Sequence, residues 1–88
     1  MSNEQEAIIL AREAGSLMEN PALRQAFESV EGHYTEVWKA SGPSEYELRE
    51  ECHAQLFALG QLRRQLRSYL ETGKILSAAS ENQTSVGT

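Results

Sequence analysis

The chain has 88 residues, enough for one small domain. Its 13 acidic residues, all glutamate, outnumber eight lysines and arginines, and the net charge of −5 argues against a nucleic-acid binder that relies on neutralising phosphates. The single Cys52 cannot form an internal disulfide, no secretory signal pattern is present, and the longest apolar run, Ala7 to Ala11, is too short to cross a bilayer. We therefore expect a protein of the cytoplasm that does not bind membranes.

A first helix is predicted over residues 3–19. Asn3 and Glu6 resemble a capping box that opens this segment. The spacing of Leu10, Ala14 and Leu17 places an apolar stripe on one face of the helix. Gly15 weakens the segment by about 1 kcal/mol relative to alanine. We therefore expect Gly15 to lie where another backbone comes close.

A second helix is predicted over residues 21–40, because asparagine is a preferred N-cap and proline is preferred at the first helical position. Asn20-Pro21 permits two interpretations, a kink in one long helix or a break between two. Apolar side chains then recur at steps of four and three, as a helix–helix seam requires. The predicted core residues of this segment are Leu23, Phe27, Val30, Tyr34 and Val37.

A third and longer helix is predicted over residues 44–73. The turn Ser41-Gly42-Pro43 precedes it, Ser44 and Glu47 form a capping-box pattern, and Gly73 is the expected stop. The predicted core residues of this helix are Leu48, Cys52, Leu59, Leu62 and Leu66. A turn this short makes antiparallel neighbours, so the two apolar stripes would face each other. The first helix would cover the remaining end of the long one.

The predicted fold is therefore all-α, an antiparallel helical hairpin with an additional N-terminal helix. The hairpin is either part of a three-helix bundle or a kinked two-helix coiled coil. Residues 1–76 would form one helical domain. Residues 77–88 are rich in Ser, Ala, Asn, Thr and Gly, and their composition predicts a disordered tail.

Catalytic, metal and cofactor sites are not predicted. His33, Cys52 and His53 are too few for a structural zinc site, and the last two are adjacent, which points them about 100° apart on a helix. Nucleophilic catalysis by Cys52 would need an oriented base and a closed pocket. Residues 8–30 also permit a helix-turn-helix interpretation, but the net charge makes them a poor reader of DNA.

An interaction surface is predicted on the long helix instead. The predicted helix is acidic at its beginning and basic toward its other end, so two antiparallel copies crossing near Leu56 and Phe57 would set opposite charges against each other. Phe57 lies off the main apolar stripe, which is unusual for a monomer. The basic residues proposed for contact are Arg63, Arg64 and Arg67. A solvated basic face is the simpler interpretation of that cluster.

Three stretches of the chain together resemble small helical proteins of tailed bacteriophages and prophages. They are Leu-Met-Glu-Asn-Pro-Ala-Leu at residues 17–23, Trp38 at the end of the second helix, and the long helix from Glu-Leu-Arg-Glu-Glu to Leu-Glu-Thr-Gly-Lys. The resemblance covers residues 10–76 and carries no assigned activity. It implies a phage setting, with the chain in the host cytoplasm or incorporated into the virion, and a phage-encoded partner.

Three functions follow as hypotheses. The first, which we favour, is a non-enzymatic structural or assembly protein that acts through helix-mediated self-association and binding of another protein. The second is an acidic inhibitor of a host nucleic-acid-binding protein. The third is a small DNA-binding regulator or packaging component. Salt-sensitive retention on DNA would favour the third, and selective capture of a host nucleic-acid enzyme would favour the second.

Overall fold

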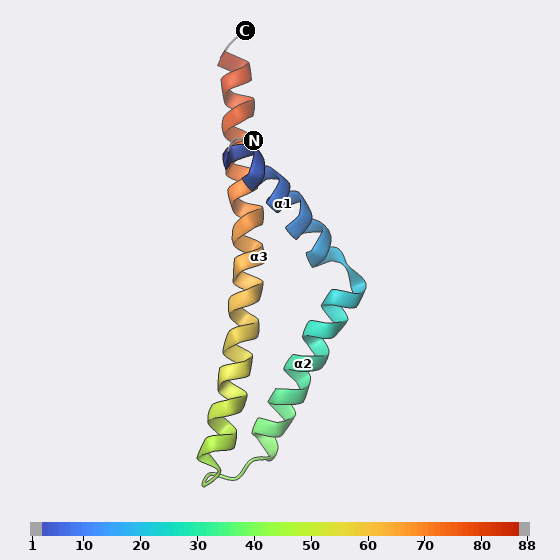
Figure 1. Cartoon of the computed structure of the whole chain (residues 1–88), viewed down its shortest axis with the longest axis vertical. Coiled ribbons are helices and arrows are strands. Elements are labelled where there is room, and N and C mark those ends of the chain that lie inside the picture. The colour runs from blue at the N-terminus through green and yellow to red at the C-terminus, as the bar shows by residue number, and fades with distance from the viewer. Residues whose placement is uncertain (1–2, 87–88) are drawn as a thin grey trace. The chain divides into compact units, whose positions relative to one another are not determined.

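The structure is a computed structural model that describes the backbone of residues 3–86 and the side chains of residues 3–79. It confirms the all-α prediction, with helices α1 (Asn3–Glu19), α2 (Pro21–Ala40) and α3 (Tyr46–Val86) (Figure 1). The chain divides into two compact units. The α2 unit, Asn20–Arg63, pairs α2 with the first part of α3, and the α1 unit combines α1 with α3 from Arg64 onward.

Asn20 separates α1 from α2. Its backbone is extended, with φ −69° and ψ 120°, and its side-chain Oδ1 accepts a hydrogen bond from the Leu23 N–H at 3.0 Å. Pro21 follows at the first helical position, where its missing N–H has no intrahelical partner to lose. The sequence left open whether Pro21 kinks one helix or separates two. Because the backbone of Asn20 is extended, α1 and α2 are two separate helices.

The start of α3 differs from the prediction by two residues. The helix begins at Tyr46, after a turn in which the Glu45 N–H donates to the Gly42 carbonyl at 3.0 Å. The first helical residue is therefore Tyr46, two residues after the predicted cap Ser44. Ser44 lies within the turn that brings the chain back, so the Ser44–Glu47 pattern does not mark the first helical turn.

The end of α3 differs more. The helix continues through Gly73 to Val86, and none of the described glycines has a positive φ. A glycine ends a helix by adopting the left-handed conformation. Gly73 keeps helical geometry, so the predicted stop is wrong. The backbone of residues 77–86 is helical and belongs to α3; whether the tail is disordered stays a prediction, and residues 87–88 lie outside the described residues.

The α2 unit is a hairpin of two antiparallel helices with a narrow core. Phe27 of α2 and Cys52 of α3 are buried, at 8% and 1% exposure, as predicted. Four more predicted core residues of this unit are half-buried, namely Leu23, Tyr34, Val37 and Leu59. Leu66 is also half-buried but belongs to the α1 unit. Three predicted core residues are exposed instead, namely Val30, Leu48 and Leu62. Two helices cover only a narrow strip of each other, and Leu62 lies about 80° round α3 from Cys52, outside that strip.

The α1 unit is packed through small residues. Ala11, Ala14 and Gly73 are buried. A Cβ placed on Gly73 would overlap the Cβ of Ala11, and one placed on Gly15 would lie 3.3 Å from the Leu70 side chain. Gly73 therefore lets α1 approach α3 closely. As predicted, α1 packs against the later part of α3, although the close backbone approach occurs at Gly73 and not at Gly15.

Candidate functional site

Arg63 is engaged within the α2 unit. Its Nη1 lies 2.6 Å from Oε2 of Glu31, and its guanidinium stands 4.8 Å above the centre of the Phe27 ring. The two side chains of the ion pair are 35% and 37% exposed. Arg63 thus covers one side of the buried Phe27 while its charge is balanced by α2. This geometry gives Arg63 a structural role in the hairpin; its predicted role in interaction stays a prediction.

Arg49 makes a second contact of this kind nearer the turn. Its guanidinium lies 4.4 Å from the centre of the Trp38 ring. A cation over an aromatic face contributes about 0.5–1 kcal/mol where it is exposed to solvent. Trp38 keeps 43% of its surface exposed, so Arg49 shields only part of the ring. The two arginines therefore hold α2 and α3 together at separate points along the hairpin.

The opposite side of α3 forms a different surface, which we call the outer face and define by Tyr46, Glu50, His53 and Phe57. These residues recur at steps of four, three and four, so they follow one line along the helix. Phe57 lies about 140° round the helix from the buried Cys52. Tyr46 is 72% exposed and Phe57 is 53% exposed. Large aromatic groups thus stand on the side of the helix that faces away from α2.

Phe57 stacks on the side chain one helical turn before it. The His53 and Phe57 rings are stacked, with centroids 6.4 Å apart and planes inclined by 28°. The two residues are four positions apart, the spacing that brings helical side chains together. Both rings remain exposed in this contact. The outer face therefore presents two adjacent, exposed aromatic rings.

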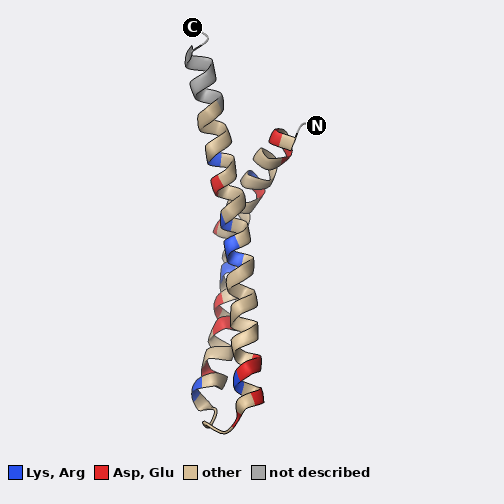
Figure 2. Cartoon of the chain, turned by 90° about the vertical axis from the view of Figure 1, so that its left-hand side faces the viewer, with Lys and Arg blue, Asp and Glu red and all other residues tan. Residues whose placement is uncertain are grey.

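Charge varies along α3. Figure 2 shows acidic residues on its first turns and basic residues farther along the same helix. Glu50 is exposed on the outer face, one helical turn before His53 and Ala54. Arg64 and Arg67 are exposed farther along the helix. Leu56, which the sequence places in the interaction surface, is half-buried.

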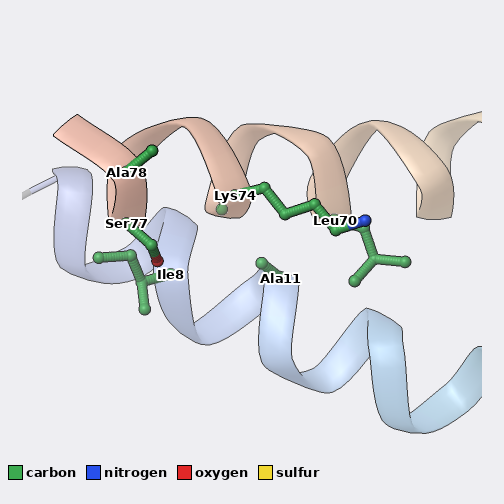
Figure 3. A pocket seen from close by; sticks show the side chains of 7 residues that line it. Ile8, Ala11, Leu70, Lys74, Ser77 and Ala78 are labelled. Atoms are coloured by element: carbon green, nitrogen blue, oxygen red, sulfur yellow. The ribbon is translucent and has the colours of Figure 1, made fainter. Parts of the chain in front are cut away.

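A shallow groove occurs in the α1 unit where α1 crosses α3 (Figure 3). It has a volume of about 340 Å³ and a mostly apolar lining. The lining residues are Ile8, Ala11, Leu70, Gly73, Lys74, Ser77 and Ala78. Lys74 is its only ionisable lining group, so the groove holds no acid–base pair or metal ligands. Ala11 and Gly73, which approach each other closely, both contribute to its lining.

The candidate ligands of the sequence do not come together. Cys52 is buried, whereas His33 and His53 are exposed. Within the part of the chain that the structure describes, no group of three or more His, Cys, Asp or Glu side chains could hold a metal ion. The His33 ring instead contacts the Tyr34 ring edge-on, at 5.1 Å between centroids.

The structural roles of two residues were not predicted from the sequence. Glu31 is the partner of Arg63, and Gly73 is the point of closest approach in the α1 unit. The position of Glu31, four residues after Phe27, was a usable signal, because such residues lie on one helical face. Gly73 had no such signal, since a packing glycine and a terminal glycine look alike in the sequence.

No described helix combines the length and the apolar character needed to cross a membrane. Comparison of the chain with models of protein families, with curated proteins and with solved structures finds no match. These comparisons therefore assign no family, and the resemblance to phage proteins stays a prediction. The candidate site rests on its own geometry, an exposed aromatic surface on α3.

Proposed function

We propose that the chain is a non-enzymatic interaction or assembly protein that binds another protein chain through the outer face of α3. The exposure of Phe57 and Tyr46 on the side of α3 away from α2 carries this proposal. Aromatic residues are enriched in the centres of protein interfaces, where they supply most of the binding energy. Phe57 is the expected anchor of the interface.

The small core of the chain supports the same function. The buried hydrophobic residues among those described are Ala11, Ala14, Phe27 and Cys52. Several large apolar side chains remain exposed in the α2 unit alone, namely Val30, Trp38, Tyr46, Leu48, Phe57 and Leu62. A small domain gains much of its stability by burying such side chains in a partner. Assembly thus serves stability as well as recognition.

Nucleic-acid binding is supported less well. It relied on Arg63, Arg64 and Arg67 acting together, and Arg63 is held by Glu31 and Phe27. Two exposed arginines beside a net charge of −5 supply few phosphate contacts. If the resemblance to phage proteins reflects common origin, the partner is a phage-encoded protein and the assembly is a virion or an intermediate of its construction.

Photo-crosslinking tests the proposal. We would replace Phe57 with p-benzoylphenylalanine, a photoreactive residue of similar shape, and irradiate the full chain in the organism that carries its gene. In the control variant, p-benzoylphenylalanine replaces Gln25, which is exposed on α2. We expect protein adducts of defined mass from position 57 and not from position 25. Absence of protein adducts, or equal yields at both positions, would overturn the proposal.

A further inference from the structure

We infer that the partner of the outer face is a second copy of this chain, paired in antiparallel orientation about a two-fold axis at Phe57. This inference rests on the function proposed above and specifies its partner. In such a pair, each residue that precedes Phe57 by a given number faces the residue that follows Phe57 by the same number. The register can therefore be tested residue by residue.

In this register, opposite charges on the two copies of α3 face each other. Glu50 precedes Phe57 by seven residues and Arg64 follows it by seven, so each Glu50 faces the Arg64 of the other copy. Both side chains are exposed on α3, a single continuous helix. Seven residues correspond to two helical turns, so Glu50, Phe57 and Arg64 lie near one line along α3. The two-fold axis generates this ion pair twice.

The residues next to Phe57 are small enough for the helices to approach. Ala54 precedes Phe57 by three positions and Gly60 follows it by three, so they face each other in this register. Ala54 is exposed, and a Cβ placed on Gly60 would meet no atom within 4 Å. The two Phe57 side chains can therefore pack across the axis beside short side chains. His53 in turn faces Gln61, which can hydrogen-bond with the imidazole.

The parallel alternative is disfavoured by the same charges. It would place Glu50 against Glu50 and Arg64 against Arg64, and like charges facing each other across an interface disfavour association. The antiparallel contact also reaches Tyr46, which faces Ser68 eleven residues beyond Phe57. This contact extends from Tyr46 to Ser68 of α3, or about 33 Å along the helix.

Charge exchange tests the register. Dimerisation of the full chain is measured by sedimentation equilibrium at low salt. We expect E50R and R64E each to raise the dissociation constant by about tenfold or more, because each variant sets like charges against each other at both sites. The double variant E50R/R64E restores both ion pairs with reversed polarity. Its dissociation constant should return to within about threefold of the parent value.

Matched controls remove the effect of net charge and of folding. E51R changes the charge as E50R does, but Glu51 lies about 100° round the helix, and R24E places the same change on α2. Both controls should dimerise as the parent does at low salt. Circular dichroism should show equal helix content in all variants, since each changed residue is exposed. Raising the salt concentration should weaken the parent dimer, because exposed ion pairs are screened.

A parent chain that stays monomeric at millimolar concentration would overturn the inference. Single variants that dimerise like the parent, or a double variant that fails to recover, would overturn the register. The mass of the position-57 adduct in photo-crosslinking distinguishes failure of the dimer inference from failure of the proposed function. An adduct with twice the mass of the chain supports the dimer, whereas an adduct with a different protein keeps the proposed function and rejects self-association.

Discussion

The α1 unit and the α2 unit are each stabilised internally by a different kind of helix–helix contact. In the α1 unit, Ala11 lies against Gly73, and the contact depends on the absence of side-chain atoms. In the α2 unit, Phe27 is buried beneath the Arg63 guanidinium, and the contact depends on large side chains being present. One unit is therefore sensitive to added atoms and the other to removed atoms. Both kinds of contact involve the same helix, α3.

This difference separates stability from recognition along α3. The side of the helix toward α2 carries Cys52 and Arg63, which are used within the α2 unit. The outer face carries Tyr46 and Phe57, which are exposed. Substitutions toward α2 should therefore change the free energy of unfolding, whereas substitutions on the outer face should change binding alone. The predictions below test the internal contacts in order of expected effect.

Phe27→Ala should have the largest effect. Removing a buried aromatic side chain costs about 3–5 kcal/mol, through lost burial and the cavity that remains. This is a large part of the stability of a domain of this size. The free energy of unfolding would be measured by urea titration with circular dichroism. Val30→Ala, three residues later and 41% exposed, is the matched control and should cost much less.

If Phe27→Ala and Val30→Ala lowered the free energy of unfolding equally, the core would not be centred on Phe27. Residue-resolved hydrogen exchange adds a second readout. In the Phe27→Ala variant, amides of α2 should exchange faster by a larger factor than amides of α1, because Phe27 contributes to the α2 unit.

Gly73→Ala should destabilise the α1 unit, although alanine is the better helix former. Alanine gains about 1 kcal/mol in helix propensity, but its Cβ would overlap that of Ala11 and force the helices apart. Overpacking of this kind costs about 1–3 kcal/mol, so we expect a net loss of up to about 2 kcal/mol. Hydrogen exchange of α1 amides, measured by NMR, reports this loss directly.

Gly32→Ala is the matched control, because a Cβ at Gly32 meets no atom within 4 Å. The free energy of unfolding of that variant should rise by about 1 kcal/mol, the full difference in helix propensity between glycine and alanine. Gly73→Ala combined with Ala11→Gly removes the overlap and should recover the slow exchange of α1. Equal stabilisation by Gly32→Ala and Gly73→Ala would contradict the close approach of Ala11 and Gly73.

Arg63→Lys should have the smallest effect. Lysine keeps the charge near Glu31 but loses the planar group that stacks on Phe27. The pair is about one-third exposed, so solvent screens much of its attraction. We expect a loss of about 0.5–1 kcal/mol in the free energy of unfolding. Arg24→Lys, on the exposed side of α2, should leave that free energy unchanged within error.

The sequence by itself determined where α1 and α2 begin and end. Asn20 and Pro21 have local preferences that hold in any surroundings, so the break between the helices could be predicted from two residues. The recurrence of Phe27 and Cys52 in apolar stripes likewise predicted two residues of the core. The exposure of Phe57 also followed from its position off the stripe.

Only the tertiary structure decided what Gly73 and Arg63 do. A glycine can end a helix or admit a second helix, and the choice depends on whether Ala11, distant in the sequence, comes close. Arg63 can contact solvent, a partner or its own hairpin, and the choice depends on where α2 places Glu31 and Phe27. Local preference acts within a few residues, whereas these roles are set by contacts between helices that the chain brings together only on folding.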